Sequence, residues 1–544
     1  MEQISTQNTK NEKKLNDFVW LKDLKVPGQS RAGVILSYLI LTMPIISFVL
    51  LYAVFLFSGQ FCSSLHVNML PIFLASFGVL LFICFDVPNA LLNKKTFSFG
   101  SFVKDTLKNK PETIIIFAMF VWILLTGFFA RNFPQNFAMF HTEDGWSYLQ
   151  ESLIYFIFYF FIFLFAVNLK YAETRKNLLI TFIFTTTIIC ITTLIFHQKE
   201  LLISYENNTN WANCFVNSNH MGYVLCLSTS ILSITFGLSK THKWRIVAGL
   251  LLALHLFVSM FNDTLGALVA IIVAVIATPI VVCIKEKRLN LYSFIPFVML
   301  VAISYISIPL AKYMHSTYNN LFNQFLGIFK DFFKISADPL AEEAKKAGTN
   351  RWELWLDAFK AIKENPLFGD GDVFVKPHNE YLQFAAHSGI VAGLLYVAGF
   401  VVIAIKGIKY FKHLTNVTMV GLISVMAYAI NACFGNTMPH TYPFFLVILG
   451  ITIASLNSDI KNYKSNNRNT FGIEKSFEFV EKADPNKNEQ PSKAQQPQSE
   501  NTENHTEIEG ETTALSEVSN NPITNNDETI IATKPANKAS NLSK

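Results

Sequence analysis

Long apolar runs separated by short polar segments make up most of the chain between residues 34 and 456. About 20 apolar residues are enough for a helix to cross the hydrocarbon core of a bilayer. The seventh and eighth runs are separated only by Asn262 and Asp263, which predicts a tight hairpin. The pattern predicts an all-α integral membrane protein with about 12 transmembrane helices, over residues 34–57, 69–92, 112–130, 152–169, 177–196, 219–238, 245–261, 264–284, 291–311, 387–405, 417–434 and 442–456.

The basic residues lie mostly on one side of these predicted helices. If the N-terminus is cytoplasmic, the cytoplasmic segments up to residue 412 carry 23 Lys and Arg, whereas the short loops on the other side carry only Arg131 and Lys199. Cytoplasmic loops of membrane proteins are enriched in Lys and Arg. The bias therefore predicts a cytoplasmic N-terminus, and an even number of spans then predicts a cytoplasmic C-terminus.

The polar segments divide the chain into five parts. Residues 1–33 form a cytoplasmic segment, which is too long and too polar to lead a cleaved signal peptide, so the first helix is expected to remain as an anchor. Helices one to nine occupy 34–311, an extracytoplasmic loop follows at 312–386, and helices ten to twelve occupy 387–456. Residues 457–544 are rich in Asn, Glu, Thr and Ser and are predicted to be a disordered cytoplasmic tail.

Composition excludes a soluble protein, because 51% of the residues are hydrophobic and only 15% are charged. The seven cysteines are scattered, without CxxC spacing, and most lie inside apolar runs. They predict core packing, with neither a disulfide framework nor a zinc site.

The loop at 312–386 contains an amphipathic helix in "NRWELWLDAFKAIKENP". Asn350 is a predicted N-cap, with Glu353 three residues later, and Pro366 ends the helix. Arg351 at the helix start could join free backbone N–H groups in holding an anion. The alternative is that Arg351 pairs with an acidic neighbour.

His378 follows Pro377 at the junction between this loop and the tenth predicted helix. A histidine there can act as a base near neutral pH, or it can be an interfacial polar residue without chemistry. His387 lies deeper on the same helix and is interpreted as packing or supporting. "DGD" at 370–372 resembles the metal motif of nucleotide-sugar glycosyltransferases, but on the outer face a glycine turn is the favoured interpretation and no metal is expected.

Three further polar residues stand at the mouths of predicted spans, namely His220, Asp263 and His440. Polar groups at membrane depth are costly and tend to line cavities. They are candidates to face the same cavity as His378, although helix capping at span ends explains them equally well.

The segment "NRWELWLDAFKAIKENPLFGDGDVFVKPHNEYLQFAAHSGIVAGLLYVAGF" resembles the hallmark of the O-antigen ligase and O-antigen polymerase family. Its features are the Arg-Trp helix start, the "NPLFG" turn, "HNEYL" and the "GIVAG" start of the next span. "FVNSNHMG" at 215–222 resembles the Asn-rich start of a middle span in that family. The resemblance covers about residues 30–455 and is most specific at 351–393.

The resemblance implies a bacterial inner-membrane enzyme that transfers glycan from an undecaprenyl-diphosphate carrier to an acceptor sugar. Carried over, His378 would be the general base and Arg351 would bind the lipid diphosphate. Substrate-binding candidates are Asn379, Arg131, His220, Asp263 and His440. The expected partners are the carrier-linked glycan, the acceptor glycan or glycolipid, the lipid bilayer and a chain-length regulator, without nucleic acid, metal or other cofactor.

One position departs from the family. Leu265 stands where an arginine is expected, so a second cationic contact to the diphosphate is missing or is supplied by another residue. The candidates to replace that arginine are Arg131, Lys312 and Lys376. The departure and the long tail favour a polymerase over a ligase. A transporter of polysaccharide or lipid-linked glycan is the alternative from another class, but the sequence lacks the internal repeats typical of carriers.

Overall fold

The computed structural model describes residues 30–481, apart from 59–63, 89–98, 109, 130–152, 198–212, 216, 263, 314–320 and 370–375. The described residues are helical and contain no strand, which confirms the predicted fold class. The membrane-region helices are α3 (Arg31–Ser58), α4 (Ser64–Leu81) with the π-helix η1 (Phe82–Asp86), α6 (Phe99–Leu107), α7 (Pro111–Phe129), α9 (Leu153–Val167), α10 (Ala172–His197), α11 (Ser218–Leu238), α12 (His242–Asn262), α13 (Leu265–Glu286), α14 (Ile295–Tyr313), α18 (Glu380–Lys409), α19 (Asn416–Asn431) and α20 (Tyr442–Glu481).

Ten of the described helices are long and apolar enough to cross a membrane. Two shorter apolar helices, Leu70–Asp86 and Tyr155–Val167, coincide with the second and fourth predicted spans. Each of the twelve apolar runs therefore lies on a helix, and the chain is a membrane protein. That all twelve runs cross the bilayer stays a prediction.

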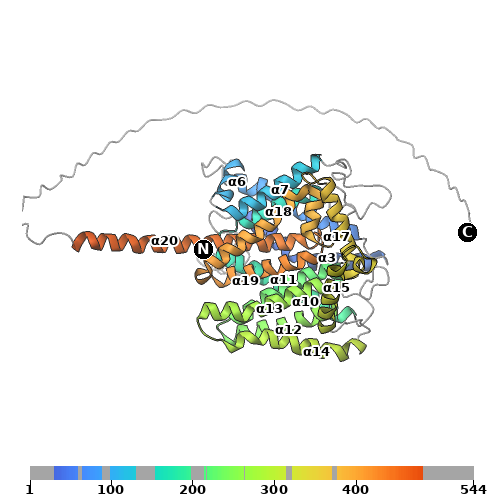
Figure 1. Ribbon diagram of the computed structural model, residues 1–544. Helices are drawn as coiled ribbons and strands as arrows, with labels where there is room; N and C mark the ends of the chain where they lie inside the picture. Colours follow the sequence, from blue (N-terminus) through green and yellow to red (C-terminus); the bar gives the residue numbers. More distant parts are fainter. Residues whose placement is uncertain are drawn as a thin grey trace, which may run out of the picture. The chain divides into compact units, whose positions relative to one another are not determined.

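The membrane region is built around α11, which is buried along nearly its whole length. Helices α10, α12, α13 and α19 pack against α11, and α18 packs along α7 (Figure 1). Apolar side chains on the outer surfaces of the bundle are exposed, for example Phe73, Leu250 and Tyr305. A surface of this kind suits contact with lipid tails rather than with water.

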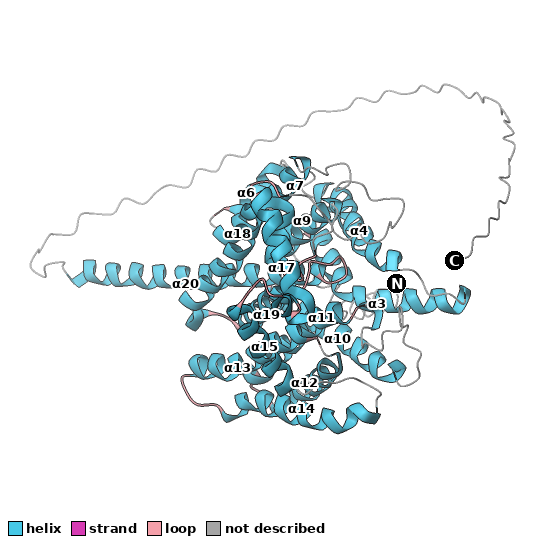
Figure 2. Ribbon diagram, turned by 45° about the vertical axis from the view of Figure 1, so that its right-hand side comes forward, coloured by secondary structure: helices cyan, strands magenta, loops and turns pink. Residues whose placement is uncertain are grey.

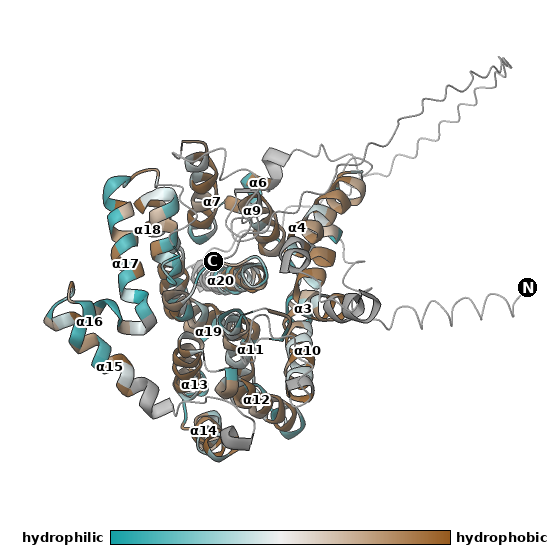
Figure 3. Cartoon of the chain, turned by 90° about the vertical axis from the view of Figure 1, so that its right-hand side faces the viewer, coloured by the Kyte–Doolittle hydropathy of each residue, from teal (hydrophilic) through white to brown (hydrophobic). Residues whose placement is uncertain are grey.

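Three helices of the 312–386 segment do not run along the spans. They are α15 (Leu321–Ala337), α16 (Glu342–Lys345) and α17 (Ala347–Glu364). With the spans seen end-on, α15 and α17 lie across the view (Figure 3), and the ribbon in Figure 2 shows α17 crossing in front of the bundle. The predicted amphipathic helix is thus present and lies crosswise to the spans.

The predicted tail boundary at 457 lies inside α20, which continues to Glu481. Between Pro443 and Gly472 no proline or glycine other than Gly450 interrupts the helix. Asp459 is buried and accepts hydrogen bonds from the backbone N–H of Thr415, at 2.7 Å, and from the Thr418 hydroxyl, at 2.6 Å. The first residues assigned to the tail therefore belong to the packed fold. Residues 477–544 form a separate unit, of which only the helical end at Glu481 is described.

Candidate functional site

The "NPLFG" turn packs onto a kink in α18. The kink lies at Ser388 and Gly389, whose backbone angles are not helical. The Ile390 N–H donates to the Pro366 carbonyl at 2.8 Å. A Cβ on Gly369 would lie 2.3 Å from the His387 carbonyl carbon, and a Cβ on Gly389 would lie 1.8 Å from the Leu367 carbonyl oxygen. Glycines on both sides thus allow two backbone segments to touch.

A tryptophan of α7 fixes the same junction from the other side. The Trp122 indole N–H donates to the Ser388 carbonyl at 2.9 Å. Its ring stacks on Phe368 of the turn, with the ring centroids 6.1 Å apart and the planes 9° apart. The "NPLFG" turn is therefore held against both α7 and α18.

His378 has a left-handed backbone conformation, with φ at 48°. Non-glycine residues rarely adopt this region, and such strain is concentrated at functional sites. The preceding carbonyl, of Pro377, accepts the Trp355 indole N–H at 2.7 Å, which ties the loop to α17. The following residue, Asn379, caps α18 by accepting the backbone N–H groups of Tyr381 and Leu382 at 3.0 and 3.2 Å. Because Asn379 is the N-cap, His378 lies directly before the first turn of α18.

The predicted N-cap of α17 is wrong. The helix begins at Ala347 with Lys346 as its N-cap, and Asn350 has a φ of 67°, which is not the extended conformation of a capping residue. Left-handed backbone at Gly348 and Asn350 bends the chain before Arg351. Arg351 is half-buried, and no carboxylate in the described ranges pairs with it.

The structure brings Arg351 and His378 within electrostatic reach of each other. Burial, together with the positive charges of Arg351 and Lys376, lowers the pKa of the His378 imidazole to about 4. Burial also lowers the pKa of the Arg351 guanidinium, while the neighbouring Tyr223 opposes that shift. His378 is therefore neutral at physiological pH, as a general base must be.

The rings of His220 and His440 contact each other, while their assignment to one cavity with His378 stays a prediction. The rings are 4.2 Å apart between centroids, and Nε2 of His440 contacts Nδ1 of His220, which also lies 3.1 Å from the Phe215 carbonyl. Burial and the neighbouring His220 hold the pKa of His440 well below its ordinary value. His378 lies within electrostatic range of His220, so the three imidazoles belong to one region.

A buried carboxylate next to His378 was missed by the sequence analysis. Glu380 is fully buried and accepts hydrogen bonds from the hydroxyls of Tyr396, at 2.6 Å, and Tyr428, at 2.8 Å. The partners lie 16 and 48 residues away, on α18 and α19. The only signal in the sequence was an acidic residue directly after "HN", inside an otherwise apolar helix.

Five buried polar side chains lie beside this carboxylate, and four of them have polar atoms without a hydrogen-bond partner, whereas the Tyr223 hydroxyl faces Glu380. We call Tyr223, Thr264, Asn431, Asn436 and Thr437 the polar cluster. The glycines beside these residues show that they are neighbours. Gly435 precedes Asn436, and a Cβ on Gly435 would lie 2.4 Å from the Tyr223 hydroxyl. Gly222 precedes Tyr223, and a Cβ on Gly222 would lie 2.9 Å from the Thr264 methyl.

The polar cluster is linked to α18, because the Thr437 N–H donates to the Gln383 side chain at 2.9 Å. Without the Tyr223 hydroxyl, which faces Glu380, the cluster still holds five of the fifteen buried side-chain atoms that lack a partner over the described residues. Buried polar groups are normally hydrogen-bonded. A concentration of exceptions beside Arg351 and His378 marks a place suited to a polar ligand.

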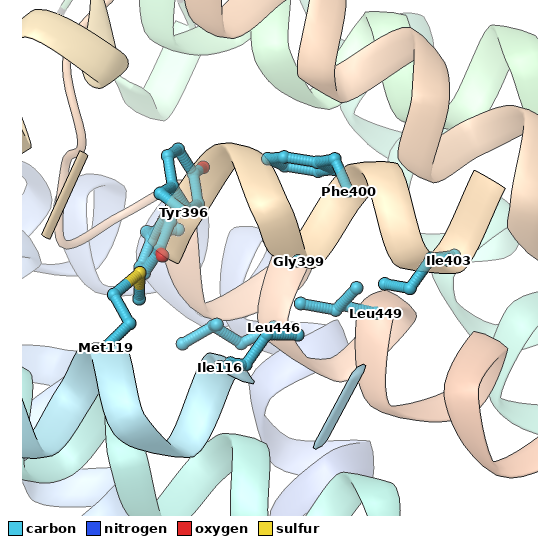
Figure 4. A pocket seen from close by; sticks show the side chains of 9 residues that line it. Ile116, Met119, Tyr396, Gly399, Phe400, Ile403, Leu446 and Leu449 are labelled. Atoms are coloured by element: carbon cyan, nitrogen blue, oxygen red, sulfur yellow. The ribbon is translucent and has the colours of Figure 1, made fainter. Parts of the chain in front are cut away.

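Some predicted site residues lie outside the described residues, namely Arg131, Asp263 and the "DGD" segment. Within the described part of the chain, no three His, Cys, Asp or Glu side chains are grouped as metal ligands would be. A small cavity between α7, α18 and α20 is lined by apolar side chains such as Ile116, Phe400 and Leu449 (Figure 4). Its lining offers no charged group, so it does not extend the site.

Residues 250–397 match the family model described as O-Antigen ligase. The matched range includes α13, α17, the "NPLFG" turn, His378 and the first half of α18. The family resemblance seen in the sequence is thereby confirmed. None of the curated proteins matches the chain.

Proposed function

We propose that this membrane protein transfers glycan from an undecaprenyl-diphosphate carrier to the hydroxyl of an acceptor sugar, in the bacterial cytoplasmic membrane. The match to the O-antigen ligase family implies glycosyl transfer in general. The single observation that carries the finer assignment is a neutral His378 beside Arg351, a half-buried guanidinium without a carboxylate partner in the described ranges.

The reaction needs a base and a cation at one place. The acceptor oxygen attacks the anomeric carbon, its proton passes to a ring nitrogen of His378, and the bond from that carbon to the diphosphate oxygen breaks with its electron pair. The diphosphate gains negative charge as it leaves. A guanidinium can donate two hydrogen bonds to a pair of phosphate oxygens, so Arg351 is suited to stabilise the leaving diphosphate.

Lys376 is the best-supported substitute for the arginine that is missing at Leu265. Its charge acts on His378, whereas Arg131 lies outside the described residues and the side chain of Lys312 is likewise not described. The polar cluster suits the neutral, hydroxyl-bearing part of the substrate, because amides and hydroxyls can both donate and accept. His220, Asn379, Asp263 and His440 stay predicted substrate contacts.

The test is transfer by the purified protein in proteoliposomes from a defined undecaprenyl-diphosphate glycan. We expect His378→Ala to lower the rate by about 10²–10⁴, the range for loss of a general base. Arg351→Lys keeps the charge but not the paired contact and should lose less than Arg351→Ala. His242→Ala, at an exposed position on α12, is the matched control.

Wild-type rates from both His378→Ala and Arg351→Ala at normal expression would refute the proposal. Transfer without any ion gradient would separate the enzyme from a transporter. We favour a polymerase over a ligase. A gene deletion that leaves single repeat units attached supports the polymerase, whereas accumulation of carrier-linked polymer supports the ligase. A chain-length regulator remains an expected partner of the polymerase.

A further inference from the structure

One face of α15 exposes a row of large apolar side chains. Leu326, Phe329 and Phe333 follow helical spacing, and Phe332 lies beside them. The exposed fractions of Phe329, Phe332 and Phe333 are 59%, 62% and 68%. Scattered apolar residues are ordinary on a protein surface, but a contiguous row on one helix face marks an interaction surface.

The remaining faces of α15 have other partners. Asp331 accepts the Gly348 N–H at 2.9 Å, which fixes the helix to the start of α17. Lys330 and Lys334 are exposed on the flank between the apolar row and the side that faces α17. A helix with an apolar face, a basic flank and a polar side is typical of one that lies in the interface of a membrane.

The position of α15 identifies the occupant of the apolar face. The helix lies across the direction of the spans (Figure 3), as a helix in the plane of a bilayer surface must. It is the next helix after the span α14, whose side chains Tyr305 and Ile306 are themselves exposed to the surroundings of the bundle. A second protein would not need to match this orientation, whereas a lipid surface would.

We propose that α15 docks on the phospholipid surface at the end of the spans where His378 lies, with Phe329, Phe332 and Phe333 inserted among the headgroups and upper acyl chains. Lys330 and Lys334 then lie at the level of the lipid phosphates. This contact does not depend on the proposed function.

The docked helix would also set the height of Arg351, a consequence that rests on the proposed function. The Asp331 contact to Gly348 and the Trp352 indole N–H on the Pro339 carbonyl, at 2.8 Å, connect α15 to the first turns of α17. Arg351 lies between those two points. The diphosphate of a lipid carrier lies at the level of the lipid phosphates. The docked α15 would therefore hold the Arg351 guanidinium at the depth of that diphosphate.

The experiment places one new tryptophan in the apolar row, in Phe332→Trp, and one on the basic flank, in Lys334→Trp, with the full chain in nanodiscs. The difference in emission from the wild type is followed in lipids brominated at shallow acyl positions and with aqueous iodide. We expect bromolipid to quench the Phe332→Trp difference signal at least about two-fold more than the Lys334→Trp signal, with the reverse order for iodide.

Quenching of the Phe332→Trp signal by iodide and not by bromolipid would show a solvated face and overturn the proposal. Protection from both quenchers would show a protein partner and overturn it as well. Equal unfolding midpoints for wild type and variants are the check on folding. Because quenching is read without substrate, an inactive enzyme with a docked α15 would refute only the proposed function.

Discussion

At the scale of single residues, the surroundings of His378 determine when it can accept a proton. An ordinary histidine is half-protonated near pH 6.5, whereas burial and the charges of Arg351 and Lys376 lower the pKa of His378 to about 4. Between these two pH values a free histidine is mostly charged, but His378 stays neutral. We therefore expect kcat/KM for transfer to persist down to about pH 4 and to fall below it, as measured in a pH–rate profile.

Removal of Lys376 tests the origin of this shift. Lys376→Gln deletes one positive charge near the ring, so the pKa of His378 rises and the acid limb of the profile moves to higher pH. Lys360→Gln, on the exposed side of α17, is the control and should leave the limb in place. An unmoved limb in Lys376→Gln would mean that another group limits the reaction at low pH.

Local segments were enough to single out His378 and Arg351 as candidates, because the family resemblance is carried by "NRW", "NPLFG" and "HNEYL". They could not decide between an anion site and an ion pair for Arg351, since that depends on which carboxylates the fold brings near. Glu380 and the polar cluster were out of reach for the same reason. The residues that surround Glu380 lie on or next to α11, α13, α18 and α19, and no local pattern connects those helices.

At the scale of elements, the contact between the "NPLFG" turn and the α18 kink depends on two glycines. Gly389 has φ 82° and ψ 162°, a region that only glycine adopts readily. Gly389→Ala should destabilise the protein by about 1–3 kcal/mol from backbone strain alone. The new methyl group would also displace the Leu367 carbonyl. Lower unfolding midpoints and lower transfer activity are the expected measurements.

Gly327→Ala is the matched control. Gly327 lies within α15, and no atom comes within 4 Å of a Cβ built there. The substitution should leave stability unchanged or raise it by about 0.5–1 kcal/mol, because alanine favours helix. Similar losses from both glycine variants would contradict the proposed packing.

Apolar run length predicted the elements well, because a bilayer demands long apolar helices and little else in a sequence produces them. The errors fall where local signals compete with packing. Asn350 resembles a cap but bends the chain instead. The polar start of the tail continues α20, where Asp459 accepts hydrogen bonds from Thr415 and Thr418 at the start of α19. The turn-to-kink contact could not be predicted, since it joins backbone segments through the absence of side chains.

At the scale of the whole molecule, one buried ion pair connects three helices. Glu112 of α7 is fully buried and meets the Lys406 ammonium of α18 at 2.6 Å, and the Asn457 amide of α20 donates to the same carboxylate at 2.6 Å. Lys406→Met leaves that carboxylate without a cation and should cost about 3–5 kcal/mol. A fall in the thermal unfolding midpoint in nanodiscs would measure the cost.

The double variant Glu112→Gln/Lys406→Met separates the charge from the packing. With both charges removed, no buried ion is left uncompensated, so most of the lost stability should return. Lys176→Met, which breaks the exposed pair with Glu173, should change stability by less than about 1 kcal/mol. A double variant no more stable than Lys406→Met alone would assign the effect to lost packing.

Helix α18 begins beside His378 and is held near its other end by the ion pair of Lys406 with Glu112. From Glu380 to Lys406, across the kink at Ser388 and Gly389, it spans at most about 40 Å at 1.5 Å per residue. Because contacts fix both ends of α18, the helix cannot shift along its axis when the bilayer becomes thinner or thicker. The lipids around it must adapt, or the whole protein must tilt. If the proposed transfer takes place at the surface beside His378, we expect its rate to depend on the acyl-chain length of the host membrane.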